Sequence, residues 1–148
     1  MDGDSLIRDA EAWAASLWAE STTRWAGREG QDKLYRTAVV FPCLESILNS
    51  LVPGEPLNLL ELGCGDGSLL ESERILNRID AGGRYIGADI SNELLCRAET
   101  KWSTGNVAFM QASLAEPGFS RRLQRSGTEW DIVLSVFAIQ EMPSFGDA

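Results

Sequence analysis

Histidine is absent from the 148 residues of this sequence, and cysteine is scarce. Without histidine the chain has no Ser-His-Asp triad, no Cys-His pair and no histidine-ligated zinc. The three cysteines, Cys43, Cys64 and Cys96, are an odd number without CxxC spacing, so they predict neither a disulfide framework nor a metal site. We expect them to be reduced, as is usual in a cytoplasmic protein.

The sequence also lacks long apolar runs and an excess of basic residues. No uninterrupted apolar run approaches the roughly 20 residues that cross a bilayer, and the start, MDGDSLIRDA, is acidic where a signal peptide is basic. The 13 Lys and Arg residues against 22 Asp and Glu give a net charge of −9, which disfavours a phosphate-binding surface. The composition therefore predicts a cytoplasmic protein with no membrane and no nucleic-acid partner.

Two styles of segment are present, and they predict a division into residues 1–52 and 53–148. In residues 1–52 apolar side chains recur at helical spacing, most clearly from Leu34 to Leu51. Pro42 predicts a kink or a break within that run, and the polar residues 21–30 predict a loop before it. The breaker cluster at 52–56, Val-Pro-Gly-Glu-Pro, ends this helical unit.

After residue 56, short apolar runs alternate with helical stretches. Strands are expected at 57–62, 84–88, 107–110 and 130–136, and helices at 68–79, 92–102 and 118–125. Ser91 is expected to cap the second of these helices, and Ser68 with Glu71 has capping-box spacing at the start of the first. The alternation predicts an α/β fold built from βαβ units with a parallel sheet and right-handed crossovers.

The stretch Leu59-Leu-Glu-Leu-Gly-Cys-Gly-Asp-Gly67 connects a buried strand directly to a helix. Its glycines allow a sharp turn and let a ligand approach the main chain without meeting a Cβ atom. Ligands of open parallel sheets bind at the carboxyl ends of the strands, where the strand order reverses. The NAD fingerprint GxGxxG would need glycine at Ser68, and a P-loop would need a lysine that this turn lacks.

A carboxylate ends the next predicted strand, in Tyr85-Ile-Gly-Ala-Asp-Ile-Ser91. Asp89 lies about 20 residues beyond the glycines, where it can accept hydrogen bonds from both hydroxyls of a ribose. NAD enzymes use the same device, so Asp89 alone does not discriminate between nucleoside ligands. A carboxylate that only interacts with the following helix dipole is the alternative interpretation.

The string Glu-Leu-Gly-Cys-Gly-Asp-Gly, at 61–67, resembles motif I of the class I S-adenosylmethionine-dependent methyltransferases. Gly-Ala-Asp-Ile-Ser, at 87–91, is similar to the turn after their second strand. The resemblance spans residues 57–142 and implies a Rossmann-like sheet with flanking helices, in which the four strands have the order 3-2-1-4. Family members have seven strands, so the resemblance implies that the C-terminal strands are lacking here.

The resemblance also implies S-adenosyl-L-methionine as the cofactor, with no metal. Gln111 and the two residues after it take the place of an adenine-contacting Asp-Ala pair, and the strand from Trp130 resembles motif IV. Glu141 is the nearest candidate for a general base. Tyr35 and Trp25 are candidates for a lid, although aromatic residues at helical spacing more often belong to a core. The expected cofactor-binding residues are Glu61, Gly63, Cys64, Gly65, Asp66, Gly67, Asp89, Ile90, Ala112, Ser113, Ser135 and Phe137.

The function implied is methyl transfer from S-adenosylmethionine to a small-molecule or protein nucleophile. The alternative is a non-catalytic, methyltransferase-like binding or regulatory subunit that needs a partner chain, which the short length favours. A dinucleotide-binding oxidoreductase domain is disfavoured by Ser68. The strand at 131–136 ends the predicted sheet without the proline, lysine or inward charge that protects an edge, so we expect a homo-oligomer or a partner subunit to cover it.

Overall fold

The computed structural model describes residues 33–102, 104–114, 118–125 and 127–136. Four parallel strands form one sheet in the order β3-β2-β1-β4. The strands are β1 (Asn58–Leu62), β2 (Arg84–Asp89), β3 (Val107–Gln111) and β4 (Ile132–Leu134). The predicted α/β class and the strand order 3-2-1-4 are confirmed. Since the chain reverses its direction across the sheet at β1, the carboxyl end of β1 lies at the topological switch point.

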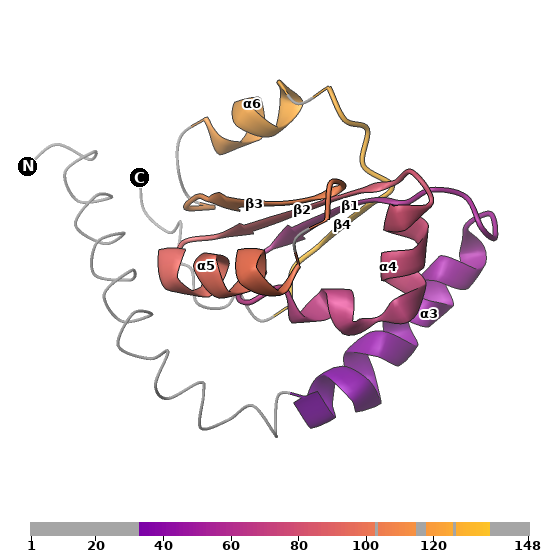
Figure 1. Cartoon of the computed structure of the whole chain (residues 1–148). Coiled ribbons are helices and arrows are strands. Elements are labelled where there is room, and N and C mark those ends of the chain that lie inside the picture. The colour runs from indigo at the N-terminus through magenta and orange to yellow at the C-terminus, as the bar shows by residue number, and fades with distance from the viewer. Residues whose placement is uncertain (1–32, 103, 115–117, 126, 137–148) are drawn as a thin grey trace, which may run out of the picture.

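Helices cover both faces of this Rossmann-like sheet (Figure 1). On one face lie α3 (Phe41–Ser50), α4 (Glu73–Asp80) and α5 (Asn92–Lys101), and on the other lies α6 (Phe119–Gln124). A short 3-10 helix, η2 (Ser68–Glu71), joins the glycine turn after β1 to α4. None of the helices in the described ranges is long and apolar enough to span a bilayer.

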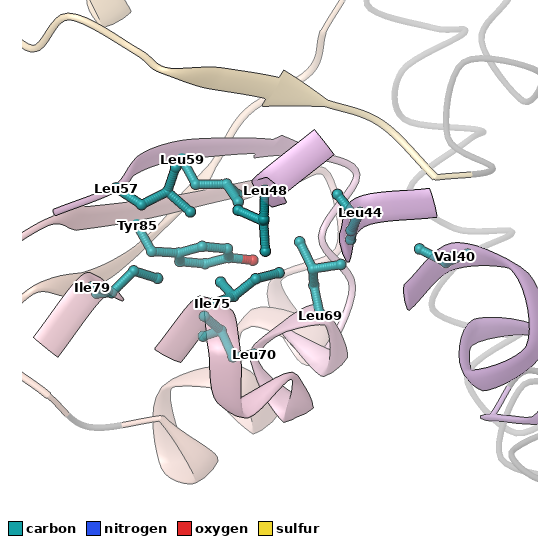
Figure 2. Close-up of a cluster of buried hydrophobic side chains, with 10 residues drawn as sticks. All are labelled: Val40, Leu44, Leu48, Leu57, Leu59, Leu69, Leu70, Ile75, Ile79 and Tyr85. Atoms are coloured by element: carbon teal, nitrogen blue, oxygen red, sulfur yellow. The ribbon is translucent and has the colours of Figure 1, made fainter. Parts of the chain in front are cut away.

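The larger core lies between the sheet and the pair α3 and α4 (Figure 2). Leu59 and Tyr85 are register partners on β1 and β2 and point into it together. Ile75 and Ile79, one turn apart on α4, are fully buried against them, and each such side chain contributes about 1.5–3 kcal/mol on burial. A second, smaller cluster under α6 contains Ala88, Ala112 and Phe119.

The helical run before β1 is continuous where a kink or break was predicted at Pro42. A π-helical segment, η1 (Arg36–Val40), continues directly into α3, and the Phe41 N–H donates to the Arg36 carbonyl. Pro42 stands in the first turn of α3, where its missing N–H breaks no α-helical bond. The predictions for residues 1–32, including the loop at 21–30, lie outside the described residues. The division of the chain into 1–52 and 53–148 also stays a prediction.

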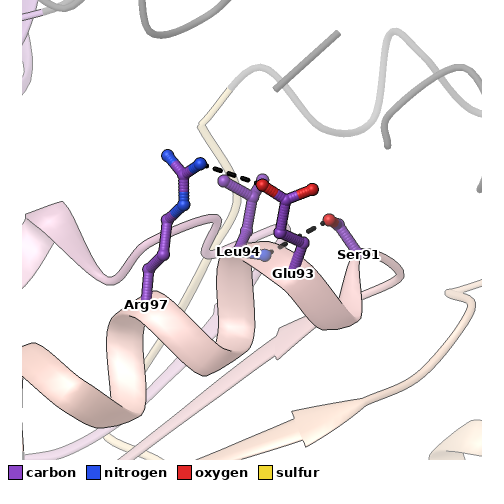
Figure 3. Close-up of polar contacts among 4 residues, drawn as sticks. All are labelled: Ser91, Glu93, Leu94 and Arg97. Atoms are coloured by element: carbon purple, nitrogen blue, oxygen red, sulfur yellow. Dashed lines mark hydrogen bonds and ion pairs between the residues drawn. The ribbon is translucent and has the colours of Figure 1, made fainter. Parts of the chain in front are cut away.

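The predicted helix at 68–79 is divided into η2 and α4, with Ser72 extended between them. The capping box predicted for Ser68 and Glu71 is wrong, because Gly67 precedes η2 in a left-handed conformation and no side chain caps it. The Ser68 N–H instead donates to Asp66 Oδ1 at 3.2 Å. The cap predicted for α5 is confirmed, since Ser91 Oγ accepts the Leu94 N–H at 3.3 Å (Figure 3).

The strand predicted at 130–136 is shorter in the structure, where β4 has three residues. Two hydrogen bonds at its start fix it to β1: the Asp131 N–H donates to the Asn58 carbonyl at 2.9 Å, and the Asn58 N–H donates to Asp131 Oδ2 at 2.7 Å. Val133, on this edge strand, is 55% exposed. The register of β1 with β4 is therefore set by one aspartate at the amino end of the pair.

Candidate functional site

The turn after β1 is shaped by three glycines in the left-handed region. Gly63, Gly65 and Gly67 have φ angles of 76°, 56° and 72°, which side chains with a Cβ rarely adopt. The N–H groups of Gly63 and Cys64 both donate to the Ala88 carbonyl, at 2.7 and 3.1 Å. The turn is therefore anchored to the end of β2, at the carboxyl edge of the sheet.

Gly65 and Gly67 serve different purposes in this turn. A Cβ atom on Gly67 would lie 2.9 Å from Trp102 Cδ1 and 3.1 Å from the Phe109 ring. A Cβ atom on Gly65 would have only Leu94 Cδ1 near it, at 4.0 Å. Gly67 thus lets the turn pack on two aromatic rings, whereas the space beside Gly65 is open to an approaching ligand.

Asp89 is held beside Gly65 by main-chain hydrogen bonds. Its Oδ2 accepts the Gly65 N–H and its Oδ1 accepts the Ser91 N–H, both at 2.8 Å. Burial raises the pKa of Asp89, and its bonds to main-chain N–H groups oppose that rise. Each carboxylate oxygen has a further lone pair, so the group can still accept hydroxyl hydrogen bonds in the orientation that the two amides impose.

Glu61 and Cys64, two of the expected cofactor-binding residues, lie beneath the turn. Glu61 is 5% exposed, and the Tyr85 hydroxyl donates to its Oε2 at 2.5 Å. Burial raises the pKa of Glu61 to about 8, so this carboxyl group is protonated at neutral pH. The Cys64 thiol is buried against Gly87, where a Cβ atom would lie 2.7 Å from Sγ, and burial raises the pKa of the thiol. Both side chains support the turn from below, and their contact with a ligand stays a prediction.

Most main-chain donors of the turn are already in use. The N–H groups of five residues donate to protein acceptors, and these residues are Gly63, Cys64, Gly65, Gly67 and Ser68. A diphosphate needs free N–H donors and a positive potential at such a turn. Three carboxylates lie in or beside it instead, those of Asp66, Asp89 and Glu71, the last of which pairs with Lys101. Within the described ranges no acidic and cysteine side chains converge in a metal-binding cluster.

The residues expected to contact adenine lie next to Asp89, at the ends of β2 and β3. Ala112 is buried, and its N–H donates to the Asp89 carbonyl at 2.9 Å. Gln111 Nε2 donates to the Ile90 carbonyl at 3.1 Å, and Ser113 is half-buried. The structure therefore brings Ile90, Ala112 and Ser113 to the same edge as Asp89, while the Ala112 N–H is not free for a ligand.

Three buried polar atoms of the described residues have no hydrogen-bond partner: Arg36 Nε, Trp102 Nε1 and Ser135 Oγ. Trp102 packs on Gly67, and Ser135 follows Leu134, the β4 partner of Glu61. Such a group costs about 1–3 kcal/mol when it is left unpaired, so each marks a point where the described residues leave a hydrogen bond unmade. Ser135 was predicted for this site. Arg36 and Trp102 were not, and Trp102 lies beside the turn only through the packing at the end of α5.

The structure says less about the remaining residues that were predicted for the site. Tyr35 is described and 42% exposed. Phe137, Glu141 and Trp25 lie outside the described residues, so their predicted roles stay predictions.

Comparisons with known proteins found similar solved structures. No protein-family model and no curated protein matches this sequence. Among similar solved structures, an S-adenosylmethionine-dependent methyltransferase from Mesorhizobium loti has 23% identity and a TM-score of 0.39, over 51% of this chain and 32% of that one. A putative enzyme of the same kind from Listeria monocytogenes has 23% identity and a TM-score of 0.44, over 68% and 43%.

A TehB-like S-adenosylmethionine-dependent methyltransferase from Corynebacterium glutamicum has 18% identity and a TM-score of 0.46, over 78% of this chain and 57% of that one. This chain therefore spans less than two thirds of each of these proteins. The chain has the four-stranded Rossmann-like sheet that its resemblance to the class I methyltransferases predicts, and the solved structures similar to it are S-adenosylmethionine-dependent methyltransferases.

Proposed function

We propose that the chain binds S-adenosylmethionine over residues 63–67 and Asp89, and that it serves in methyl transfer to a small-molecule or protein nucleophile. The observation that carries this proposal is the carboxylate of Asp89, fixed 2.8 Å from the N–H of the open Gly65. A ligand at this place gains ribose hydrogen bonds and close contact with the main chain. It gains little from phosphate capture, because most main-chain donors of the turn are in use.

The charges around the turn support the same ligand. S-adenosylmethionine carries a sulfonium and an ammonium group, and the acidic residues near the turn favour positive charge there. The two phosphates of NAD would meet the same carboxylates unfavourably. The sulfonium supplies the reactivity for methyl transfer, and the residues of this chain bind and orient the ligand.

A non-catalytic, methyltransferase-like subunit is the second candidate. It is favoured by the exposure of Val133 on β4, for which β1 is the sole neighbour within the described sheet. A partner chain that covers this edge could also complete the site for a nucleophile. Both candidates bind S-adenosylmethionine, and only the enzyme transfers its methyl group.

Calorimetric titration with S-adenosylmethionine, its demethylated product and NAD tests the proposal. We expect both adenosyl ligands to bind and NAD to bind at least about tenfold more weakly, a difference of 1.4 kcal/mol. Equal or tighter binding of NAD would contradict the proposal. Formation of the demethylated product with a panel of nucleophiles then separates the enzyme from the non-catalytic subunit.

A further inference from the structure

The helical segment formed by η1 and α3 carries an exposed row of apolar side chains. α3 is the outermost of the three helices on its face of the sheet (Figure 1). Six large apolar side chains of the described residues are exposed, and five of these lie in residues 34–52. A concentration of exposed apolar side chains in one place marks a surface that another segment or molecule covers.

Four residues form the centre of this surface, which we call the outer row. They are spaced four residues apart, and they are Tyr35, Val39, Cys43 and Ile47. Positions four apart lie on one side of a helix, one turn after another. The three large side chains are 40–47% exposed, and Cys43 is exposed as well. The adjacent row, which begins at Val40, is buried in the larger core, so the apolar side of the segment is wider than the surface that the core covers.

The neighbouring helix α4 does not cover the outer row. Arg74 of α4 contacts Glu45 at 3.9 Å and Asn49 at 2.8 Å. These two positions lie on the opposite side of α3 from Cys43 and Ile47, because two residues turn an α-helix through about 200°. α4 therefore packs beside the other flank of α3, and a cover for the outer row has to come from another part of the chain or from another molecule.

The sequence before Lys33 contains an apolar segment of matching length. Residues 5–19 lie outside the described part of the chain and contain neither glycine nor proline, and Leu6, Trp13 and Leu17 recur in them at spacings of seven and four. This pattern predicts an amphipathic helix. At about 1.5 Å per residue, the apolar side of that helix is about 17 Å long, and the outer row is about 18 Å long.

The connection between the two segments favours a contact within one chain. Residues 20–32 can span at most about 45 Å, which lets a helix at 5–19 fold back antiparallel beside α3, as in an αα-hairpin. A segment tethered by a short connection has an effective concentration of the order of millimolar. It therefore competes favourably with a second copy of the chain at micromolar concentration.

We propose that residues 5–19 form a helix that packs antiparallel on the outer row, with Leu6, Trp13 and Leu17 facing it. The exposed apolar side chains of this row are thus an internal contact of the chain and not a surface for a partner. This inference is independent of the proposed function, and it holds whether or not the chain binds S-adenosylmethionine.

Cys43, in the middle of the outer row, is a natural probe of this contact. Among the described residues Cys43 and Cys96 are exposed, whereas Cys64 is buried. Alkylation of the full chain with N-ethylmaleimide, followed by mass spectrometry of its peptides, gives the rate at each cysteine. Leu17→Asp places a charge in the contact and should raise the rate at Cys43 at least about tenfold, which corresponds to 1.4 kcal/mol of protection. The rate at Cys96, on α5, should stay unchanged.

Ala19→Asp is the matched control for Leu17→Asp. It adds the same charge two residues later, on the opposite side of the expected helix, and should leave Cys43 protected. Cys64 reports whether the fold is intact. If Cys64 becomes reactive in Leu17→Asp, that variant has unfolded, and Leu17→Ala takes its place with a rise at Cys43 still expected.

Every outcome supports or overturns the inference. A rise at Cys43 in the Leu17 variant alone, independent of protein concentration, supports it. An unchanged rate at Cys43, or an equal rise in Ala19→Asp, overturns it. Protection of Cys43 that grows with protein concentration would show that a second copy covers the outer row, and would overturn it as well. None of these results changes the calorimetric test of ligand binding, so the two proposals fail separately.

Discussion

Asp89 is the residue on which the ligand site depends most directly. Replacing it with alanine removes the acceptor for a ribose, and loss of a charged hydrogen bond costs about 1.5–3 kcal/mol, or at least about tenfold in affinity. Asp89→Asn keeps one oxygen acceptor and should lose less than Asp89→Ala. Calorimetry with S-adenosylhomocysteine measures both. An unchanged dissociation constant in Asp89→Ala would remove Asp89 from the site.

The two glycines of the turn should respond differently to the same substitution. Both have positive φ angles, so valine at either position adds about 1–2 kcal/mol of backbone strain. Gly67→Val also drives a Cβ atom into Trp102 and Phe109, and should lower the melting temperature more. Gly65→Val should abolish ligand binding while most of the fold is kept, because its side chain fills the open space. Circular dichroism with calorimetry compares the variants, and normal binding by Gly65→Val would make the turn a purely structural one.

The raised pKa of Glu61 predicts that the folded chain becomes less stable as the pH rises. Its pKa is raised by burial from 4.5 to about 8 in the folded state, so the folded chain keeps a proton that the unfolded chain releases. The stability that the folded chain gains by keeping this proton is fully present below pH 4.5 and is lost as the pH rises toward 8. At 1.36 kcal/mol per unit, the loss approaches about 5 kcal/mol.

Glu61→Gln retains an acceptor for the Tyr85 hydroxyl and has no proton to lose. The variant should therefore show a flatter profile than the unmodified chain between pH 5 and 8, and greater stability at pH 8. Urea unfolding at several pH values measures this difference. Parallel profiles for the two proteins would show that Glu61 does not carry a raised pKa.

Among the secondary structure elements, α5 depends on a cap that can be tested alone. Ser91→Ala removes the acceptor of the Leu94 N–H (Figure 3) and should destabilise the chain by about 1 kcal/mol. Arg97→Ala removes the exposed 2.9 Å ion pair with Glu93, one turn earlier in α5, and should cost less than about 0.5 kcal/mol. Thermal unfolding compares them, and a larger loss for Arg97→Ala would reverse this ranking.

Elements defined by local chemistry were predictable from the sequence, and elements defined by packing were not. The cap of α5 acts over three residues, so Ser91 and the helix start could be read directly from the sequence. The division of the predicted helix at 68–79 depends on Gly67, which turns left-handed so that Trp102 and Phe109 can pack on it. Nothing within residues 67–72 contains that information.

The same distinction holds for the site. The glycine turn and Asp89 were predicted because both follow strands, and parallel strands bring their carboxyl ends together. Trp102 reaches the turn only through the packing of the end of α5 in the whole molecule. Glu61 was predicted as a ligand contact, and that contact stays a prediction; its place beside Tyr85, set by the register of β1 with β2, was not predicted.

At the scale of the whole molecule, we propose that β4 is an association edge. Val133 is 55% exposed on this strand, and an unprotected edge favours pairing with a second chain. Light scattering at micromolar concentration should give a mass above the 16.2 kDa of one chain. Val133→Lys should shift the population toward the monomer, and Val39→Lys, at an exposed position on η1, is the control. A monodisperse monomer of the unmodified chain would contradict the proposal.

The pairing of β1 with β4 also has a consequence for synthesis on the ribosome. Asn58 and Asp131, which fix that pair, are 73 residues apart in the chain. β2 emerges soon after β1 and can pair with it at once, whereas the opposite side of β1 stays open until residues 131–134 have been translated. At about 5–20 residues per second this interval lasts on the order of seconds. The central strand of the finished sheet is therefore an exposed edge during translation, when a chaperone can bind there and a neighbouring nascent chain can pair with it.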